Sequence, residues 1–192
     1  MAPMSGTTLT CLDLWVRAGS RFERPGEEGI AHFLEHMVFK GSKCLGAGEF
    51  DRKIEALGGS SNAATGFDDV HFYVLIPPNV VAPALELLLE LVLKPALLPE
   101  AFALEREVVL EEIAQQNDQP EEKVFQKLLS TCWNNHAYGR PILGTEKSLK
   151  KITPAQMRSF HNRLYTGENF CLSIAGSIPK GIEKLIERSL LA

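Results

Sequence analysis

His32, Glu35 and His36 constrain the fold and chemistry of this chain more than any other feature of its sequence. The two histidines are four residues apart, and a helix turns once every 3.6 residues, so in a helix both rings extend from one face and can reach a single cation. Apolar residues recur through the segment at helical spacing: Ile30, Phe33, Leu34, Met37 and Val38. We therefore predict an amphipathic helix over residues 26–39 that carries a metal site.

A third metal ligand has to come from outside this helix. Zinc suits neutral imidazole, and a catalytic zinc site has three protein ligands and an open position for water. Glu35 fits better as the base that takes a proton from that water. A second helix, predicted over residues 99–116, contains Glu105 and Glu112, which are seven residues apart and share a face. One of them could bind the metal while the other steadies the site, although most glutamates on such a helix face solvent.

The remaining pattern predicts strands and helices that alternate along the chain. Strands are predicted at residues 8–18, 60–65, 70–76 and 170–178, and further helices at 48–57, 80–93, 120–133, 154–165 and from 179 onward. The segment 136–151 is rich in glycine and proline and predicts a loop. This order favours an α+β fold, a mainly antiparallel sheet with helices packed against it.

Composition narrows the class of protein further. The 192 residues are 45% hydrophobic, which fits one domain, residues 1–192, with a core of its own. The net charge of −4, without a basic block, argues against a nucleic-acid partner. The longest apolar run, residues 80–93, is too short for a bilayer and is interrupted by a proline and two glutamates, so we expect no membrane span. Four scattered cysteines favour a reducing compartment, the cytoplasm, although two disulfides stay possible.

Two segments together resemble the pitrilysin family of inverzincin metallopeptidases, which includes insulin-degrading enzyme and the β subunit of mitochondrial processing peptidase. Residues 32–41 resemble the family's zinc helix, with its H-x-x-E-H motif, and residues 106–113 resemble its distal glutamate segment. The resemblance implies a zinc metalloendopeptidase. It makes Glu112 the third zinc ligand beside His32 and His36, Glu35 the general base, and Glu105 a carboxylate that supports a ligand.

A third segment, residues 58–65, resembles the family's substrate-binding edge strand. There a peptide substrate adds to the sheet as an extra strand, and Asn62 and Ala63 occupy the matching positions. The alternative is that Asn62 only serves the turn after Gly58 and Gly59.

The resemblance also implies that this chain acts with a partner. Family members carry two homologous domains in each half, and the second domain covers the active site and supplies an arginine and a tyrosine. We therefore expect an N-terminal catalytic domain that lacks its first strand and its C-terminal homologous domain, and that works as part of a homo- or heterodimer. A competing hypothesis is a non-catalytic zinc-binding or assembly subunit, inactive without a partner domain. The presence of all four motif residues argues against it.

Overall fold

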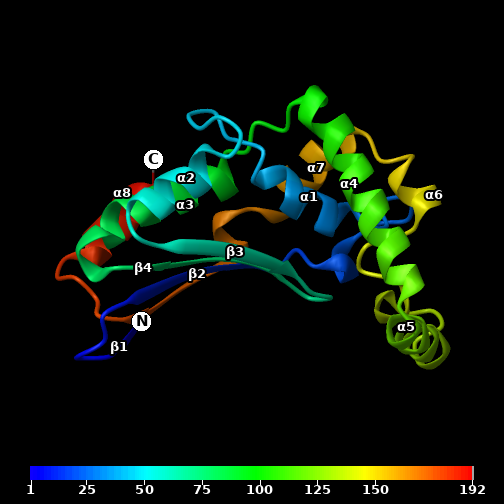
Figure 1. Cartoon of the computed structure of the whole chain (residues 1–192), viewed down its shortest axis with the longest axis horizontal. Coiled ribbons are helices and arrows are strands. Elements are labelled where there is room, and N and C mark those ends of the chain that lie inside the picture. Colours follow the sequence, from blue (N-terminus) through cyan, green and yellow to red (C-terminus); the bar gives the residue numbers. More distant parts are fainter. Residues whose placement is uncertain (192) are drawn as a thin grey trace.

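A single five-stranded sheet organises the molecule. The computed structural model describes residues 1–191, and the side chains of residues 1–187. The strands lie in the order β1-β5-β2-β4-β3 (Figure 1). Their bounds are β1 Ala2–Pro3, β2 Thr10–Val16, β3 Ser60–Thr65, β4 Val70–Ile76 and β5 Phe170–Gly176. All neighbours pair antiparallel except β1, which runs parallel to β5. The predicted α+β fold with a mainly antiparallel sheet is confirmed.

The sheet buries one face because apolar residues alternate with polar ones along its strands. In β2, Leu12 and Leu14 are buried, while Asp13 and Trp15 between them are only half-buried. Leu12 lies opposite Val74 of β4 and Ile174 of β5, so the buried side chains form continuous rows across the strands. Helices cover that face of the sheet (Figure 1). The core therefore sits between one face of the sheet and the helices.

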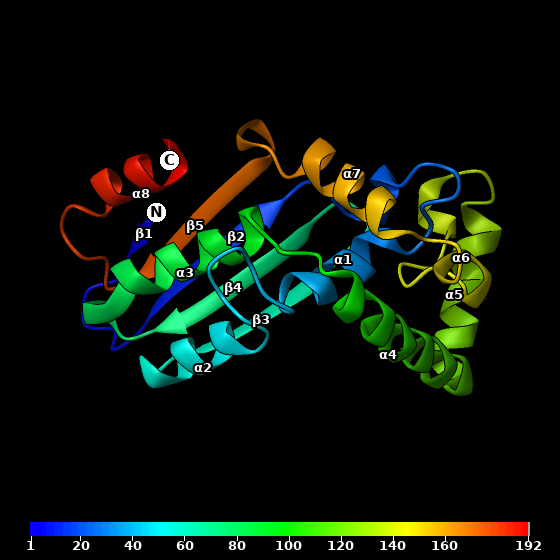
Figure 2. The ribbon, with the colours of Figure 1, turned by 90° about the horizontal axis from the view of Figure 1, so that it is seen from above.

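The helices fall into groups along the sheet, as the view from above shows (Figure 2). Near one end of the sheet lie α2, α3 and α8, whereas α1 and α7 lie at the other end, with α4, α5 and α6 beyond them (Figures 1 and 2). Their bounds are α1 Ile30–Val38, α2 Glu49–Ala56, α3 Val81–Leu93, α4 Pro99–Asp118, α5 Pro120–Cys132, α6 Glu146–Leu149, α7 Pro154–Leu164 and α8 Ile182–Leu191. None of the helices described is both long enough and apolar enough to cross a membrane.

Every predicted helix and strand is present in this arrangement, and the two largest differences concern α1 and α6. Helix α1 begins at Ile30, four residues later than predicted, because Gly26 and Gly29 have positive φ angles of 87° and 91°, outside the right-handed helical region. The segment predicted as a loop, residues 136–151, contains α6, so that prediction was wrong for four residues. A capping box between Thr145 and Ser148 satisfies the first backbone N–H groups of this short helix.

The N-terminal residues add a little to the sheet. Residues Ala2–Pro3 form β1, which pairs with Ala175 and Gly176. The absence of a longer first strand, and the assignment of residues 1–192 to one N-terminal domain, stay predictions.

Packing between α1 and α4 holds the polar face of α1 in place. The inner side chains of α1, such as Phe33 and Met37, are fully buried. The Phe33 ring lies against that of Phe102 on α4, with centroids 4.6 Å apart. The buried face of α4 continues through Glu105 and Val109. Two helices from distant parts of the sequence therefore meet at a fixed register.

Candidate metal centre

The first turn of α1 is held by a buried side chain from outside the helix. Glu23 accepts hydrogen bonds from the backbone N–H groups of Gly29 and Ala31, at 3.0 and 3.1 Å. Gly29 is needed here because a Cβ atom at this position would lie 2.6 Å from the carbonyl oxygen of Leu143. Burial raises the pKa of the Glu23 carboxyl to about 8, and the two N–H groups and the nearby Arg140 charge offset only part of that effect. The turn that precedes His32 is thus fixed by tertiary contacts.

Three side chains converge at the packed face between α1 and α4. The Nε2 atoms of His32 and His36 lie 3.7 and 3.4 Å from Oε2 of Glu112. All three donor atoms lie within 4.8 Å of one another. Two ligand atoms bound to one tetrahedral zinc ion are about 3.3 Å apart, given metal–ligand distances near 2.0–2.1 Å. The donor set therefore fits a zinc ion, and the structure brings together the three residues predicted as ligands.

The environment of the histidines keeps them available as ligands. Desolvation, and secondarily the positive charge of His36, lowers the pKa of His32 to about 4, so its ring is neutral at pH 7 and offers a lone pair. Glu105, which is only 6% exposed, faces Nδ1 of His36 at 2.9 Å through Oε1. Its other oxygen forms an ion pair with Nζ of Lys40 at 2.7 Å. The ring of His36 is thereby held with Nε2 toward Glu112.

Glu35 projects from α1 toward the sheet. Its Oε2 atom accepts a hydrogen bond from the hydroxyl of Thr65, the last residue of β3. Burial raises the pKa of the Glu35 carboxyl, while the Thr65 hydrogen bond and the charge of His36 lower it in part. A carboxyl with a raised pKa is a better proton acceptor than an exposed glutamate, as a general base requires.

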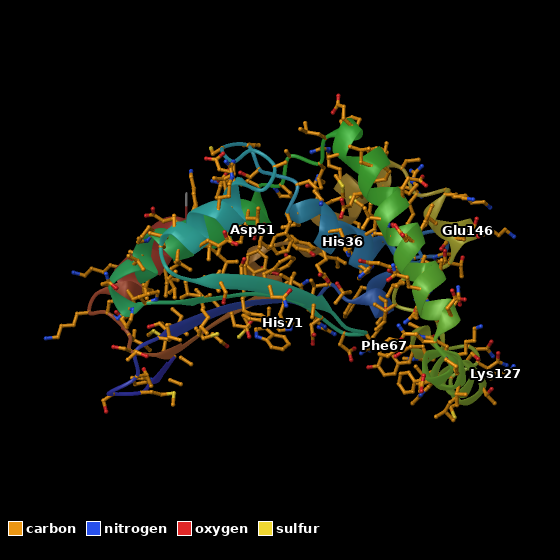
Figure 3. All side chains as sticks on the ribbon, viewed as in Figure 1. His36, Asp51, Phe67, His71, Lys127 and Glu146 are labelled. Carbon is orange, nitrogen blue, oxygen red and sulfur yellow. The ribbon has the colours of Figure 1, made fainter. Side chains whose placement is uncertain are left out.

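A cavity of about 320 Å³ opens beside these groups. His32, Glu35 and Thr65 form part of its wall, and Phe67 and Phe125 contribute apolar surface. Figure 3 shows His36 on α1, above the end of the sheet where Phe67 lies in the β3–β4 connection, close to α5. His32, Glu35 and Thr65 therefore border a cleft whose wall is partly apolar.

Several residues at this site were not anticipated from the sequence. They are residues of segments without a candidate metal ligand, or residues that follow α1: Thr65, Phe67, Phe125 and Lys40. Strand alternation was the one usable signal: Thr65 shares a face of β3 with Ala63, and Ala63 also borders the cleft.

The segment predicted as an edge strand does lie at the edge of the sheet. Strand β3 pairs with β4 on one side only and is the last strand in the order. Asn62 is exposed, and its Oδ1 atom accepts a hydrogen bond from the backbone N–H of Ala63, at 2.9 Å. The free edge is therefore available for another strand, and the roles of Asn62 and Ala63 in binding a peptide stay predictions.

Comparison with known proteins assigns the chain to a family. Residues 5–146 match the family described as Insulinase (Peptidase family M16). The chain is an M16 peptidase-family member. An uncharacterized zinc protease of Rickettsia bellii is 38% identical over 167 residues, which cover 87% of this chain and 40% of that protein. The β subunit of the mitochondrial processing peptidase of Dictyostelium discoideum is 33% identical over 176 residues, covering 91% of this chain and 37% of its own length.

Solved structures agree with the M16 assignment. A protease from Helicobacter pylori superposes with a TM-score of 0.90 and 30% identity, and the match covers 97% of this chain and 45% of the other. An M16 inactive domain from Pseudomonas fluorescens superposes equally well, with a TM-score of 0.90, but at 22% identity this shows the fold alone. This M16 chain spans less than half the length of each of these relatives.

Proposed function

We propose that this chain provides the catalytic domain of a zinc-dependent metalloendopeptidase, with His32, His36 and Glu112 as zinc ligands. The observation that carries the proposal is the convergence of two Nε2 atoms on one Glu112 oxygen, at 3.7 and 3.4 Å. Separations of this size fit neighbouring ligands of one tetrahedral ion. Membership of a peptidase family whose relatives include proteins described as zinc proteases supports the same metal.

Different residues of the chain bind the metal, transfer the proton and orient a ligand in the proposed reaction. A zinc ion at this site would lower the pKa of a water molecule and polarise the carbonyl of the scissile peptide bond. Glu35 takes a proton from the attacking water and returns it to the amine that leaves. Glu105 holds the His36 ring through Nδ1, which fixes the tautomer that presents Nε2 to the metal.

The free edge of β3 is the proposed place for the peptide. A substrate strand would form main-chain hydrogen bonds with this edge beside Asn62 and Ala63, while side chains would project into the cleft. The cleft borders both Glu35 and the edge strand, so a peptide bond held there lies within reach of the base.

A partner completes this site in our proposal. The relatives are more than twice as long as this chain, which supports a second homologous domain or subunit over the cleft, in a homo- or heterodimeric assembly. We expect the isolated chain to bind zinc with little turnover of peptide. The four cysteines, free in the structure, support a reducing compartment such as the cytoplasm.

Zinc stoichiometry and peptide cleavage test this function together. Both are measured for this chain, for the chain with its C-terminal counterpart, and for Glu35→Gln of each. We expect one zinc ion per chain in every case, and cleavage only in the assembly with Glu35 intact. Glu55→Gln, an exposed site on α2, is the control and should leave cleavage unchanged.

Two results would contradict the proposal. Full cleavage by Glu35→Gln would show that Glu35 is not the general base. Absence of bound zinc would show that the three candidate ligands do not form a zinc site. Zinc binding without cleavage in the complete assembly would favour the competing function, a non-catalytic zinc-binding or assembly subunit.

A further inference from the structure

The carboxylate of Glu35 is tied to the edge strand of the sheet. The hydroxyl of Thr65, at the end of β3, donates a hydrogen bond to Oε2 of Glu35 on α1. Among the described residues this is the only hydrogen bond to the Glu35 carboxylate. Oε1 therefore has no competing donor and is the oxygen free to accept a proton.

We propose that Thr65 is a positioning residue that holds Glu35 in the orientation needed for proton transfer, and that it links this orientation to the strand that receives the peptide. This inference rests on the proposed function, in which Glu35 is the base. Thr65 acts on proton transfer through Glu35 and is not one of the proposed zinc ligands.

The choice of threonine has a physical reason. A glutamate has several rotatable bonds, and half-buried carboxylates change orientation unless a donor holds them. A β-branched residue in a strand has a restricted χ1 angle, so the Thr65 hydroxyl is itself held in direction. A hydrogen bond from such a donor to a charged acceptor is stronger than one between neutral groups. The side chain thus fixes Glu35 at little cost in its own conformational freedom.

Because Thr65 lies on β3, the orientation of Glu35 is coupled to the binding of a peptide at the edge of that strand. Thr65 pairs with Val70 of β4, and the other side of β3 is free. A peptide added to that free edge extends the hydrogen-bonded ladder and restrains the strand on both sides. Because Thr65 belongs to this strand, occupation of the edge also restrains the donor that orients Glu35. Peptides that engage β3 poorly are therefore expected to lose kcat as well as affinity.

Three variants separate the hydroxyl from the shape of the side chain. Thr65→Val keeps the β-branched shape and removes the donor, Thr65→Ser keeps the donor, and Thr65→Ala is a second variant without a hydroxyl. Ser61→Ala is the matched control, because Ser61 lies on the same strand and donates to a carboxylate of α2, Asp51 at 3.0 Å, away from the cleft.

The first measurement needs neither metal nor turnover. In the metal-free chain at one fixed pH, the ¹³C resonance of the Glu35 carboxylate is assigned by its loss in Glu35→Gln. We expect it to shift in Thr65→Val and Thr65→Ala, to return close to its original position in Thr65→Ser, and to stay unmoved in Ser61→Ala. An unmoved resonance in both variants without a hydroxyl would overturn the proposal.

The second measurement is peptide cleavage by the zinc-loaded assembly of this chain with its C-terminal counterpart. For Thr65→Val we expect kcat to fall about 10- to 100-fold with KM changed less than about threefold, and Thr65→Ser to recover most of the rate. Unchanged kcat in Thr65→Val despite a shifted resonance would overturn the positioning role. Absence of cleavage by the unmodified protein, with the resonance responding as expected, would overturn the proposed function and leave the contact between Thr65 and Glu35 supported.

Discussion

Glu105 offers the sharpest test of the proposed zinc site, because its carboxylate contacts one of the three candidate ligands. It is 6% exposed and uses both carboxylate oxygens, one toward His36 Nδ1 at 2.9 Å and one toward Lys40 Nζ at 2.7 Å. Replacement by glutamine keeps the size and one acceptor, but removes the negative charge that strengthens the bond to His36 and neutralises Lys40.

The expected loss follows from these two contacts. Changing a residue that supports a metal-bound histidine typically reduces affinity about 10- to 100-fold, which is ~1.4–2.7 kcal/mol. Glu105→Gln retains an acceptor, so we expect a loss of zinc affinity near tenfold. Glu105→Ala leaves Lys40 unpaired beside the site and removes the acceptor, so we expect a loss near 100-fold. Lys40→Met should weaken binding by less, because Lys40 acts on the metal only through Glu105.

Competition with a fluorescent zinc chelator at pH 7.5 measures these affinities. Glu107→Gln is the control, since Glu107 is an exposed glutamate on the same helix and should bind zinc like the unmodified chain. Zinc affinity of Glu105→Gln within threefold of the unmodified chain would refute the argument that the buried carboxylate supports the ligand.

Two further predictions concern stability. Burial raises the pKa of Glu23 to about 8 from its ordinary value near 4.5, so the folded state keeps a proton that the unfolded chain releases, and stability should fall as pH rises between these values. In urea unfolding, this decline should lower the unfolding free energy by on the order of 2–4 kcal/mol between pH 5 and 8. Glu23→Gln should abolish the decline, whereas the control Glu28→Gln should retain it. An unchanged decline in Glu23→Gln would contradict the assignment of the decline to Glu23. Phe33→Ala removes a fully buried ring and should cost ~3–5 kcal/mol of unfolding free energy, against less than about 0.5 kcal/mol for Leu104→Ala, which is 74% exposed. Equal losses in these two variants would contradict the packing described between α1 and α4.

Local patterns were sufficient to predict most of the elements. The strands at residues 60–65 and 70–76 were predicted with their observed bounds, because alternation and the flanking glycines and prolines are properties of neighbouring residues. The start of α1 was predicted four residues early, because Gly26 and Gly29 adopt positive φ angles, and Gly29 does so where it packs against the distant residue Leu143. Helix α6 was missed because its capping box joins two short polar residues inside a loop-like composition.

The sequence by itself determined the chemistry that this protein can carry. With 3.6 residues per helical turn, His32 and His36 share one helical face, and Glu105 and Glu112 share a face of another helix. The types and spacing of the candidate ligands could therefore be predicted from the sequence alone. Only the tertiary structure decided which carboxylate meets which histidine. Glu112 faces both Nε2 atoms and Glu105 faces Nδ1 of His36, because α4 packs on α1 through Phe33 and Phe102 at one register. The contact from Thr65 to Glu35 was equally invisible beforehand, since contacts between segments 30 residues apart depend on packing and not on any local period.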